Sequence, residues 1–247
     1  RTDVGTEVGE LYGYVLEKVF QSKAEVEALD ANAPDGLYQE NLTDAGDFMF
    51  KDLNNDNEIT EDDRTHIGSA LPNFYYGFNF NAEYKNFDFT VSAQGAAGNK
   101  VVNAIGNGLR AGAGLENMST DLMDRWRPGN TDTGRPRIIR DDPNRNTRAS
   151  DFWLEDGDYL RFSNIELGYT LPASALDFLN LSSVRLYGSV QNAITITKYS
   201  GYDPEFNNDG LFSRGTDNGA AANKAFTDFS GGLPTPRTIL FGVKVGF

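Results

Sequence analysis

The sequence predicts an all-β fold whose strands form part of the wall of an antiparallel β-barrel that crosses a membrane. Strand-length segments with alternating apolar and polar residues recur along the 247-residue chain, and this alternation is typical of strands with two different faces. Short turns and long polar loops alternate between these segments. No apolar run approaches the roughly 20 residues that a transmembrane helix needs, whereas alternating strands can cross a membrane without such a run.

A predicted hairpin over 73–83 and 87–97 gives the clearest pattern. Apolar residues occupy every second position, and most of the residues between them are polar. The apolar positions are Phe74, Tyr76, Phe78, Phe80, Ala82, Tyr84, Phe87, Phe89, Val91 and Ala93. Lys85 and Asn86 form the short polar connection that joins two such runs in a hairpin.

Further strands are predicted at 158–171, 183–195 and 237–247. In the strand at 158–171 the apolar residues change from even-numbered to odd-numbered positions between Phe162 and Ile165. A bulge near Ser163 and Asn164, or an exit from the membrane, would explain this change. A weaker strand is expected near 9–20, which makes about six, and short helices are expected near 20–30 and 117–126.

The connections favour a membrane barrel over a soluble domain. Three long polar loops are predicted over 21–72, 98–157 and 196–236, and such loops are uncommon in compact domains. Outer-membrane barrels have short turns on the periplasmic side and long loops on the extracellular side. If the last strand runs inward, all three long loops are extracellular. An aromatic girdle then lies at the periplasmic rim, formed by Tyr84, Phe87, Tyr169 and Phe247. The aromatic residues of the chain are thus expected to face lipid or this rim.

An alternative remains open on the pattern alone. In this alternative the chain is a secreted, calcium-stabilised β-sandwich that binds carbohydrate, and its alternating aromatic residues form an ordinary core between two sheets. The two alternatives differ in what covers the apolar face of the strands, which is lipid in the barrel and a second sheet in the sandwich.

The composition excludes several classes of function. The chain has no cysteine and only one histidine, His66, which excludes disulfides, zinc–cysteine sites and cysteine nucleophiles. The net charge of −14 argues against a nucleic-acid partner, because such proteins gather Lys and Arg. The acidic stretch 155–158 is interpreted as a turn before a strand rather than as a pair of glycosidase carboxylates. We therefore expect no enzyme activity.

The segment 52–63 follows the spacing of a calcium-binding loop. Oxygen ligands are expected at positions 1, 3, 5, 7 and 12 of such a loop. The corresponding residues are Asp52, Asn54 and Asp56, the backbone carbonyl of Glu58, and Asp63. Asn57 replaces the usual glycine, and Asp63 replaces the usual glutamate. The sequence predicts a structural Ca²⁺ in an extracellular loop, with Mg²⁺ as the second choice of ion; a solvated acidic turn is the alternative.

Two other groups of residues are candidate contact sites. The first is a basic run, for which an ion-paired loop is the simplest interpretation and a contact with acidic partners is the second: Arg135, Arg137, Arg140, Arg145 and Arg148. The second is a set of aromatic residues in the predicted loops that could stack on a sugar or peptide: Trp153, Tyr199, Tyr202 and Phe206.

The chain also contains a series of blocks that resemble one protein family. They are Gly46-Asp47-Phe48 through Asp63-Arg64, Pro72-Asn73-Phe74-Tyr75-Tyr76-Gly77-Phe78, Trp153-Leu154-Glu155-Asp156-Gly157-Asp158-Tyr159-Leu160-Arg161, Leu167-Gly168-Tyr169-Thr170-Leu171-Pro172, Thr197-Lys198-Tyr199-Ser200-Gly201-Tyr202-Asp203-Pro204-Glu205, and the ending Pro236-Arg237-Thr238 to Phe247. Together they resemble the SusC/RagA-type TonB-dependent outer-membrane transporters of Bacteroidetes.

This resemblance implies that residues 1–247 are the C-terminal portion of a 22-stranded barrel closed by a plug. Such proteins import oligosaccharides or peptides through the outer membrane together with a SusD-like surface lipoprotein. TonB energises the import by acting on the N-terminal part. Because the chain starts at Arg1 and contains no segment resembling a plug, we expect it to be part of a longer protein.

Overall fold

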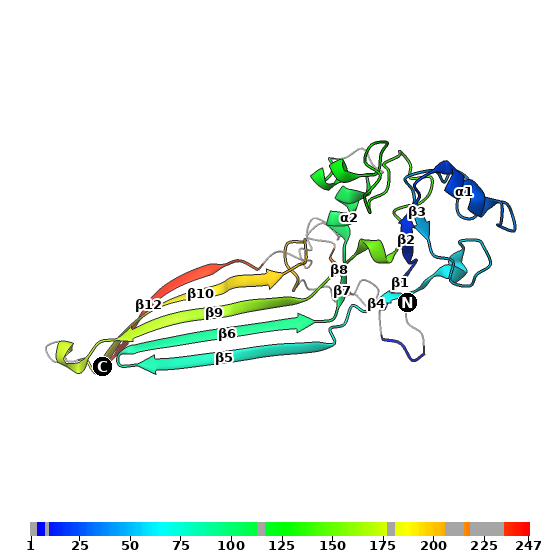
Figure 1. Ribbon diagram of the computed structural model, residues 1–247. Coiled ribbons are helices and arrows are strands. Elements are labelled where there is room, and N and C mark those ends of the chain that lie inside the picture. The colour runs from blue at the N-terminus through cyan, green and yellow to red at the C-terminus, as the bar shows by residue number, and fades with distance from the viewer. Residues whose placement is uncertain (1–3, 8–9, 113–116, 177–180, 206–214, 218–234) are drawn as a thin grey trace, which may run out of the picture. The chain divides into compact units, whose positions relative to one another are not determined.

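The computed structural model describes residues 4–7, 10–112, 117–176, 181–205, 215–217 and 235–247 (Figure 1). The chain divides into two compact units. Unit 1 contains Arg1–Leu71, Lys100–Glu155 and Asn207–Gly232, and unit 2 contains Pro72–Asn99, Asp156–Phe206 and Leu233–Phe247. None of the described helices is both long and apolar enough to cross a membrane.

Unit 2 is built on one five-stranded sheet with the order β12-β10-β9-β6-β5 (Figure 1). The strands are β5 (Phe74–Tyr84), β6 (Phe87–Ala97), β9 (Tyr159–Thr170), β10 (Ser183–Thr197) and β12 (Thr238–Gly246). Every pair of neighbouring strands is antiparallel. A short 3₁₀ helix, η4 (Ala173–Ala175), lies in the turn after β9. Five of the predicted strands therefore form the sheet in the expected chain order.

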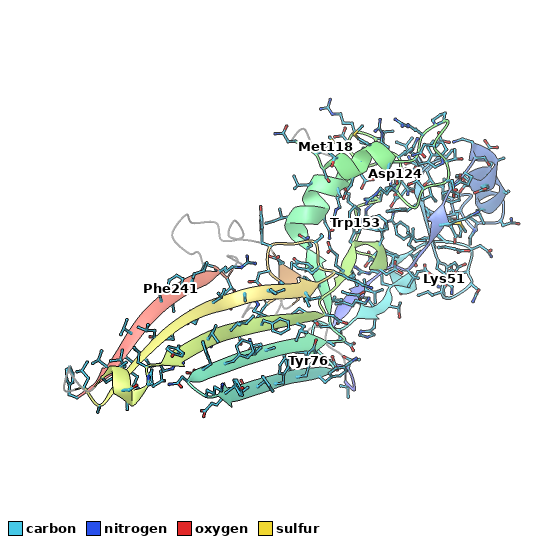
Figure 2. The ribbon with its side chains drawn as sticks, turned by 60° about the vertical axis from the view of Figure 1, so that its left-hand side comes forward. Lys51, Tyr76, Met118, Asp124, Trp153 and Phe241 are labelled. Atoms are coloured by element: carbon cyan, nitrogen blue, oxygen red, sulfur yellow. The ribbon has the colours of Figure 1, made fainter. Side chains whose placement is uncertain are left out.

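The register gathers the apolar side chains of all five strands on one face. One continuous row of paired residues crosses the sheet: Phe80, Val91, Ile165, Val190 and Ile239. Directly paired residues share a face, so the alternation in each strand adds to the same surface. The side chains of this face are exposed even when large; Phe80 is 53% exposed and Phe241 is 87% exposed. Figure 2 labels Tyr76 on one edge strand and Phe241 on the other.

The sandwich alternative is not supported by this sheet. Among the described residues of unit 2, no second sheet packs on the apolar face. A sandwich requires such a layer, because the inner faces of its two sheets form the core.

A bulge keeps the apolar face continuous along β9. Asn164 pairs with Ser92, but the next pair joins Phe162 to Ala93, so Ser163 has no counterpart in β6. Against β10 the register also shifts at this point, but there two residues, Asn192 and Ala193, stand opposite Ser163. An extra residue moves the following side chains to the other face of a strand. The predicted bulge near Ser163 is therefore confirmed, and it places Phe162 on the same face as Ile165.

The opposite face of the sheet is polar and internally paired. Arg185 Nε lies 2.9 Å from Asp88 Oδ2, and Arg185 Nη2 lies 2.7 Å from Glu166 Oε1. Gly168 provides the space for this cluster, since a Cβ atom there would lie 2.4 Å from Arg185 Nη2. The two faces of the sheet thus differ in chemistry, although Leu240 is an apolar residue on the polar face.

Unit 1 consists of short elements. Its strands are β1 (Leu11–Gly13), β2 (Leu16–Val19), β3 (Phe48–Phe50), β4 (Thr65–Gly68), β7 (Lys100–Asn103), β8 (Leu154–Asp156) and β11 (Thr216–Asp217). Its helices are α1 (Lys23–Asp30) and α2 (Ala104–Ala111), with 3₁₀ turns η1 (Glu61–Asp63), η2 (Thr120–Asp124) and η3 (Asp151–Trp153). The helix expected near 20–30 is α1, and the one near 117–126 is the 3₁₀ turn η2.

The prediction of a membrane strand at 9–20 is wrong. This segment forms β1, which pairs with β4, and β2, which pairs with β3. Tyr14 and Val15 separate the two strands, and the Tyr14 amide donates a 2.9 Å hydrogen bond to the carbonyl of Ala149. These partners come from the predicted loops, so the segment belongs to unit 1 and lies outside the five-stranded sheet.

Unit 1 has its own aromatic core. Phe20, Phe48 and Phe50 are almost completely buried, with exposures of 1%, 0% and 0%. Tyr14, Tyr38 and Trp153 are buried in the same cluster. The expectation that the aromatic residues face lipid or the membrane rim is therefore wrong for these six, which stabilise a folded unit within the long loops.

Candidate functional site

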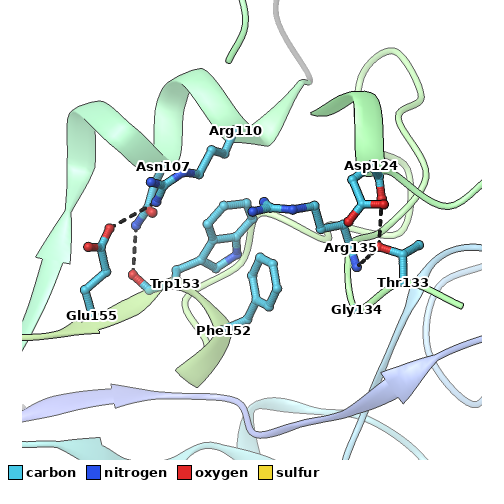
Figure 3. Close-up of a pocket in the computed structure, with 9 residues that line it drawn as sticks. All are labelled: Asn107, Arg110, Asp124, Thr133, Gly134, Arg135, Phe152, Trp153 and Glu155. Atoms are coloured by element: carbon cyan, nitrogen blue, oxygen red, sulfur yellow. Dashed lines mark hydrogen bonds and ion pairs between the residues drawn. The ribbon is translucent and has the colours of Figure 1, made fainter. Parts of the chain in front are cut away.

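A pocket of about 340 Å³ lies within unit 1 (Figure 3). Its volume is at the small end of the range for ligand sites. Its wall combines charged, amide and aromatic side chains with one glycine. The lining residues are Asn107, Arg110, Asp124, Thr133, Gly134, Arg135, Phe152, Trp153 and Glu155.

Helix α2 supplies two of the polar side chains. Asn103 caps the start of the helix by accepting a 2.8 Å hydrogen bond from the Gly106 amide. Gly112 ends it in the left-handed conformation, with φ of 66°, which glycine adopts without strain. Asn107 and Arg110 are three residues apart and therefore lie on the same face of the helix.

The 3₁₀ turn η3 supplies the aromatic part of the wall. The rings of Phe152 and Trp153 meet edge to face, with centroids 4.9 Å apart and planes at 90°. Trp153 Nε1 donates a 3.1 Å hydrogen bond to the carbonyl of Asn146. Asn107 Nδ2 donates a 2.9 Å hydrogen bond to the carbonyl of Trp153. The indole is therefore held in place by hydrogen bonds at both its ring and its backbone.

Ion pairs connect the charged groups around the pocket. Arg110 Nε lies 3.1 Å from Asp121 Oδ2, and Arg110 Nη1 lies 3.0 Å from Glu155 Oε1. The same Asp121 oxygen lies 3.6 Å from Arg135 Nη2. Figure 3 shows the guanidinium groups of Arg110 and Arg135 on two sides of the Trp153 ring. Asp121 thus bridges two cations that come from different segments of unit 1.

The predicted metal-binding residues form one hydrogen-bonded loop. Asp52 accepts hydrogen bonds from the amides of Asn55 (2.6 Å) and Asn57 (2.8 Å), through its two carboxylate oxygens. Asn54 Nδ2 donates a 2.8 Å hydrogen bond to Asp56 Oδ2. Asp56 Oδ1 accepts from the amide of Glu58 at 3.0 Å.

Asp63, the last predicted ligand, is completely buried. Its two oxygens accept hydrogen bonds from the amides of Leu53 and Thr60, both at 2.8 Å. Within the described part of the chain, no three His, Cys, Asp or Glu side chains gather as a metal-binding group. The structure therefore places the predicted residues in one loop without drawing the three carboxylates together.

The basic run is distributed over different surroundings. Arg137 forms hydrogen bonds of 2.9 and 2.8 Å with the buried carboxylate of Asp47. Arg148 lies 3.1 Å from Glu40 Oε1 and stacks 4.7 Å from the centroid of the Phe50 ring, and burial lowers its pKa. Arg135, Arg140 and Arg145 lie farther from their carboxylate partners, at 3.6, 3.7 and 3.6 Å from Asp121, Asp141 and Glu40. The interpretation as an ion-paired loop is therefore confirmed for the run, and Arg135 is its one member that lines the pocket.

The predicted aromatic contact residues also separate. Trp153 lines the pocket, Tyr199 is buried and Tyr202 is 73% exposed, and Phe206 lies outside the described residues. The sequence reasoning missed Asn107 and Arg110. Asn103 and Gly112 provided a usable signal, because an asparagine and a glycine at this spacing are typical of the two ends of a short helix.

Comparisons with known proteins give consistent relatives. No protein-family profile matches the chain. Over 244 residues the chain is 34% identical to TonB-dependent receptor P3 of Formosa agariphila. The aligned region covers 98% of this chain and 22% of that receptor. It is 27% identical to TonB-dependent receptor SusC of Bacteroides thetaiotaomicron over 173 residues, covering 64% of this chain and 15% of SusC.

A solved structure shows the same fold. The chain aligns with the structure of the RagAB peptide transporter with a TM-score of 0.68 and 18% sequence identity. The alignment covers 96% of this chain and 22% of the chain in that structure. The chain thus spans about a fifth of the length of the relatives that it matches over its whole length.

Proposed function

Because this chain belongs to the SusC/RagA-type TonB-dependent receptors and corresponds to part of one, we propose that it contributes to nutrient import through the outer membrane. In this proposal its five long strands form part of the C-terminal region of a 22-stranded, multi-pass barrel. The main observation that supports this proposal is that the sheet has one apolar and one polar face, and that the apolar side chains are exposed across all five strands. An apolar outer face and a polar inner face are the arrangement that a bilayer requires of a barrel wall.

The proposal includes the remainder of the receptor and its partners. Residues outside this chain supply the other strands, the plug and the segment that contacts TonB. The long loops, including unit 1, lie on the extracellular side and contact a SusD-like lipoprotein. The transported substrate is an oligosaccharide or a peptide. The matches to SusC and to RagAB, a peptide transporter, support these assignments.

Uptake by living cells tests this proposal. We expect deletion of the complete receptor to abolish uptake of its substrate, with fluorescent oligosaccharides and peptides as the screened probes. Re-expression should restore uptake, and collapse of the proton-motive force should stop it because TonB-dependent import requires energy. Uptake that continues after the proton-motive force is collapsed would contradict energised import and favour passive conduction.

We also propose that the loop 52–63 binds Ca²⁺ as a structural ion. The donors are Asp52, Asn54, Asp56, the Glu58 carbonyl and Asp63. They are all oxygen atoms, which Ca²⁺ prefers. Asn57 adopts a φ of 65°, so the backbone has the left-handed turn for which calcium loops use glycine. Ile59, the expected apolar anchor, is only 8% exposed.

Calorimetric titration of the complete receptor with Ca²⁺ tests this second proposal. We expect the double substitution of Asp52→Asn and Asp56→Asn to abolish Ca²⁺ binding, because it removes two of the three carboxylates. Asp62→Asn is the matched control, since Asp62 lies in the same loop but outside the ligand set. Equal binding by the double variant and the control would disprove the assignment.

A further inference from the structure

The pocket of unit 1 has donors and acceptors that are available to a ligand. Arg135 is the main donor, because its guanidinium lies 3.6 Å from its one carboxylate partner among the described residues, Asp121. That distance is longer than a hydrogen bond. Asn107 uses its Nδ2 atom on the carbonyl of Trp153, which leaves its side-chain oxygen as an acceptor at the wall. Planar groups of this kind form pairs of parallel hydrogen bonds.

The charges of the wall are balanced. Arg110 and Arg135 are the lining cations, and Asp124 and Glu155 are the lining carboxylates. Arg110 is already paired with Glu155 at 3.0 Å. Asp121 does not line the pocket, but it lies 3.1 Å from Arg110 and 3.6 Å from Arg135, so the wall has no excess of positive charge and gives little electrostatic attraction for an anionic ligand. It therefore favours an uncharged ligand that both donates and accepts hydrogen bonds.

The aromatic pair adds an apolar surface beside these polar groups. Phe152 and Trp153 are fixed at right angles to each other, and Trp153 is held by two hydrogen bonds. A rigid aromatic wall provides contact area at a low cost in conformational entropy. A sugar ring matches this combination, since its C–H groups form an apolar patch and its hydroxyls donate and accept hydrogen bonds.

We propose that this pocket binds one unit of an uncharged oligosaccharide, and that the Arg135 guanidinium donates hydrogen bonds to its hydroxyl groups. The inference rests on the proposed import function and narrows its substrate class. A peptide ligand fits the pocket less well. Peptides are commonly bound by pairing along an exposed strand edge or by capture of a charged terminus. Glu155 of β8 is the one lining residue that comes from a strand, and its carboxylate is already paired with Arg110.

Calorimetry on the complete, detergent-solubilised receptor tests the proposal. The probes are neutral oligosaccharides of glucose, galactose, mannose or xylose, matched uronic-acid oligosaccharides, and a pool of tripeptides. We expect a neutral oligosaccharide to bind most tightly, with an affinity that changes little with salt concentration. Tightest binding by a uronic-acid oligosaccharide or a tripeptide would overturn the proposal, as would binding by none of the probes.

Variants then assign the binding to the pocket. Arg135→Gln should weaken binding of the neutral oligosaccharide by about ten-fold, the loss expected for a hydrogen bond from a charged group. Arg135→Lys keeps the positive charge beside Asp121 but lacks the planar guanidinium that donates two parallel hydrogen bonds, so it should weaken binding as well. Arg140→Gln is the matched control, because the exposed Arg140 lies in the same segment and outside the pocket. Wild-type affinity in both Arg135 variants would disprove the assignment.

Uptake assays separate this inference from the proposed function. If cells import substrate but the Arg135 variants bind it normally, the pocket assignment fails and the import function stands. If the receptor binds the neutral oligosaccharide through Arg135 but never imports it, the import proposal fails and the pocket assignment stands.

Discussion

Asp203 and Arg161 form a buried ion pair that attaches the chain after β10 to β9. Both side chains are only 5% exposed. The carboxylate of Asp203 also accepts hydrogen bonds from the Thr235 amide at 2.9 Å and the Thr235 hydroxyl at 2.7 Å. Burial alone would raise the pKa of Asp203, but the hydrogen bonds from Thr235, Glu205 and Arg161 hold it below the ordinary value. One residue thus holds two segments at the end of the sheet.

Replacement of this carboxylate should loosen both segments. In Asp203→Asn, we expect the amides of Glu205 and Thr235 to lose protection from hydrogen exchange by about 1–3 kcal/mol, the cost of a broken hydrogen bond to a charged group. Because the folded-state pKa is lowered, the stabilisation is complete above the unfolded pKa and is lost as the pH falls toward the folded pKa. The difference between variant and wild type should therefore shrink below about pH 4. A difference that persists unchanged in acid would contradict this role.

At the scale of single residues, the sequence predicted the place of a residue within its strand or loop better than it predicted which side chains surround that residue. The bulge at Ser163 was visible because it shifts the apolar alternation within one strand. The paired surroundings of Arg137 and Arg148 were expected only in general terms, since Asp47 and Glu40 lie about a hundred residues away along the chain. The pocket role of Arg135 depends on α2 and η3, whose packing no local pattern reveals.

At the scale of elements, each strand of the sheet has one apolar and one polar face. On β5, Phe80 is 53% exposed on the apolar face, while its neighbour Asn79 pairs with Ser92 on the polar face. Adjacent positions of a strand point to opposite faces. Asn79 and Phe80 of β5 are therefore adjacent positions on opposite faces, and a charged side chain can be introduced at each of them and its effect compared.

A lysine on the apolar face should destabilise the receptor more than a lysine on the polar face. We expect Phe80→Lys to cost about 2–4 kcal/mol in lipid, as a charge on the lipid side of a barrel does near the bilayer centre. Asn79→Lys should cost much less, because water or polar groups surround that face. Urea unfolding in lipid vesicles measures both costs. Equal losses in the two variants would contradict the assignment of the faces.

The strands of the sheet were predictable because their partners are other alternating strands. The segment 9–20 was not, since its alternation of Leu11, Gly13, Val15 and Val19 also fits two short strands with a break at Tyr14. Hydrogen bonds from the Tyr14 amide to Ala149 and from the Asp151 amide to Tyr14 set that break. These partners are distant in sequence, and only the tertiary structure decides between one long strand and two short ones.

At the scale of the whole molecule, the aromatic residues belong to two different environments. Those of unit 2 with period two are exposed on the apolar face, such as Phe78 and Phe241. Those of unit 1, such as Phe48 and Phe50, form a buried core. The composition alone could not separate the two groups. We propose that the exposed group lies on the face of the sheet that contacts lipid.

Spin-label accessibility along β12 tests that claim most directly. The chain has no cysteine, so single cysteines can be introduced at each position of Thr238–Gly246 in the complete receptor, with any cysteines elsewhere replaced. In lipid vesicles, we expect the accessibility to alternate with a period of two residues. Contact with oxygen dissolved in the bilayer should be greatest at Ile239, Phe241, Val243 and Val245, and contact with a water-soluble nickel chelate should be greatest at Thr238, Leu240, Gly242 and Lys244. Labels that all report water, or that show no alternation, would contradict the membrane-spanning sheet.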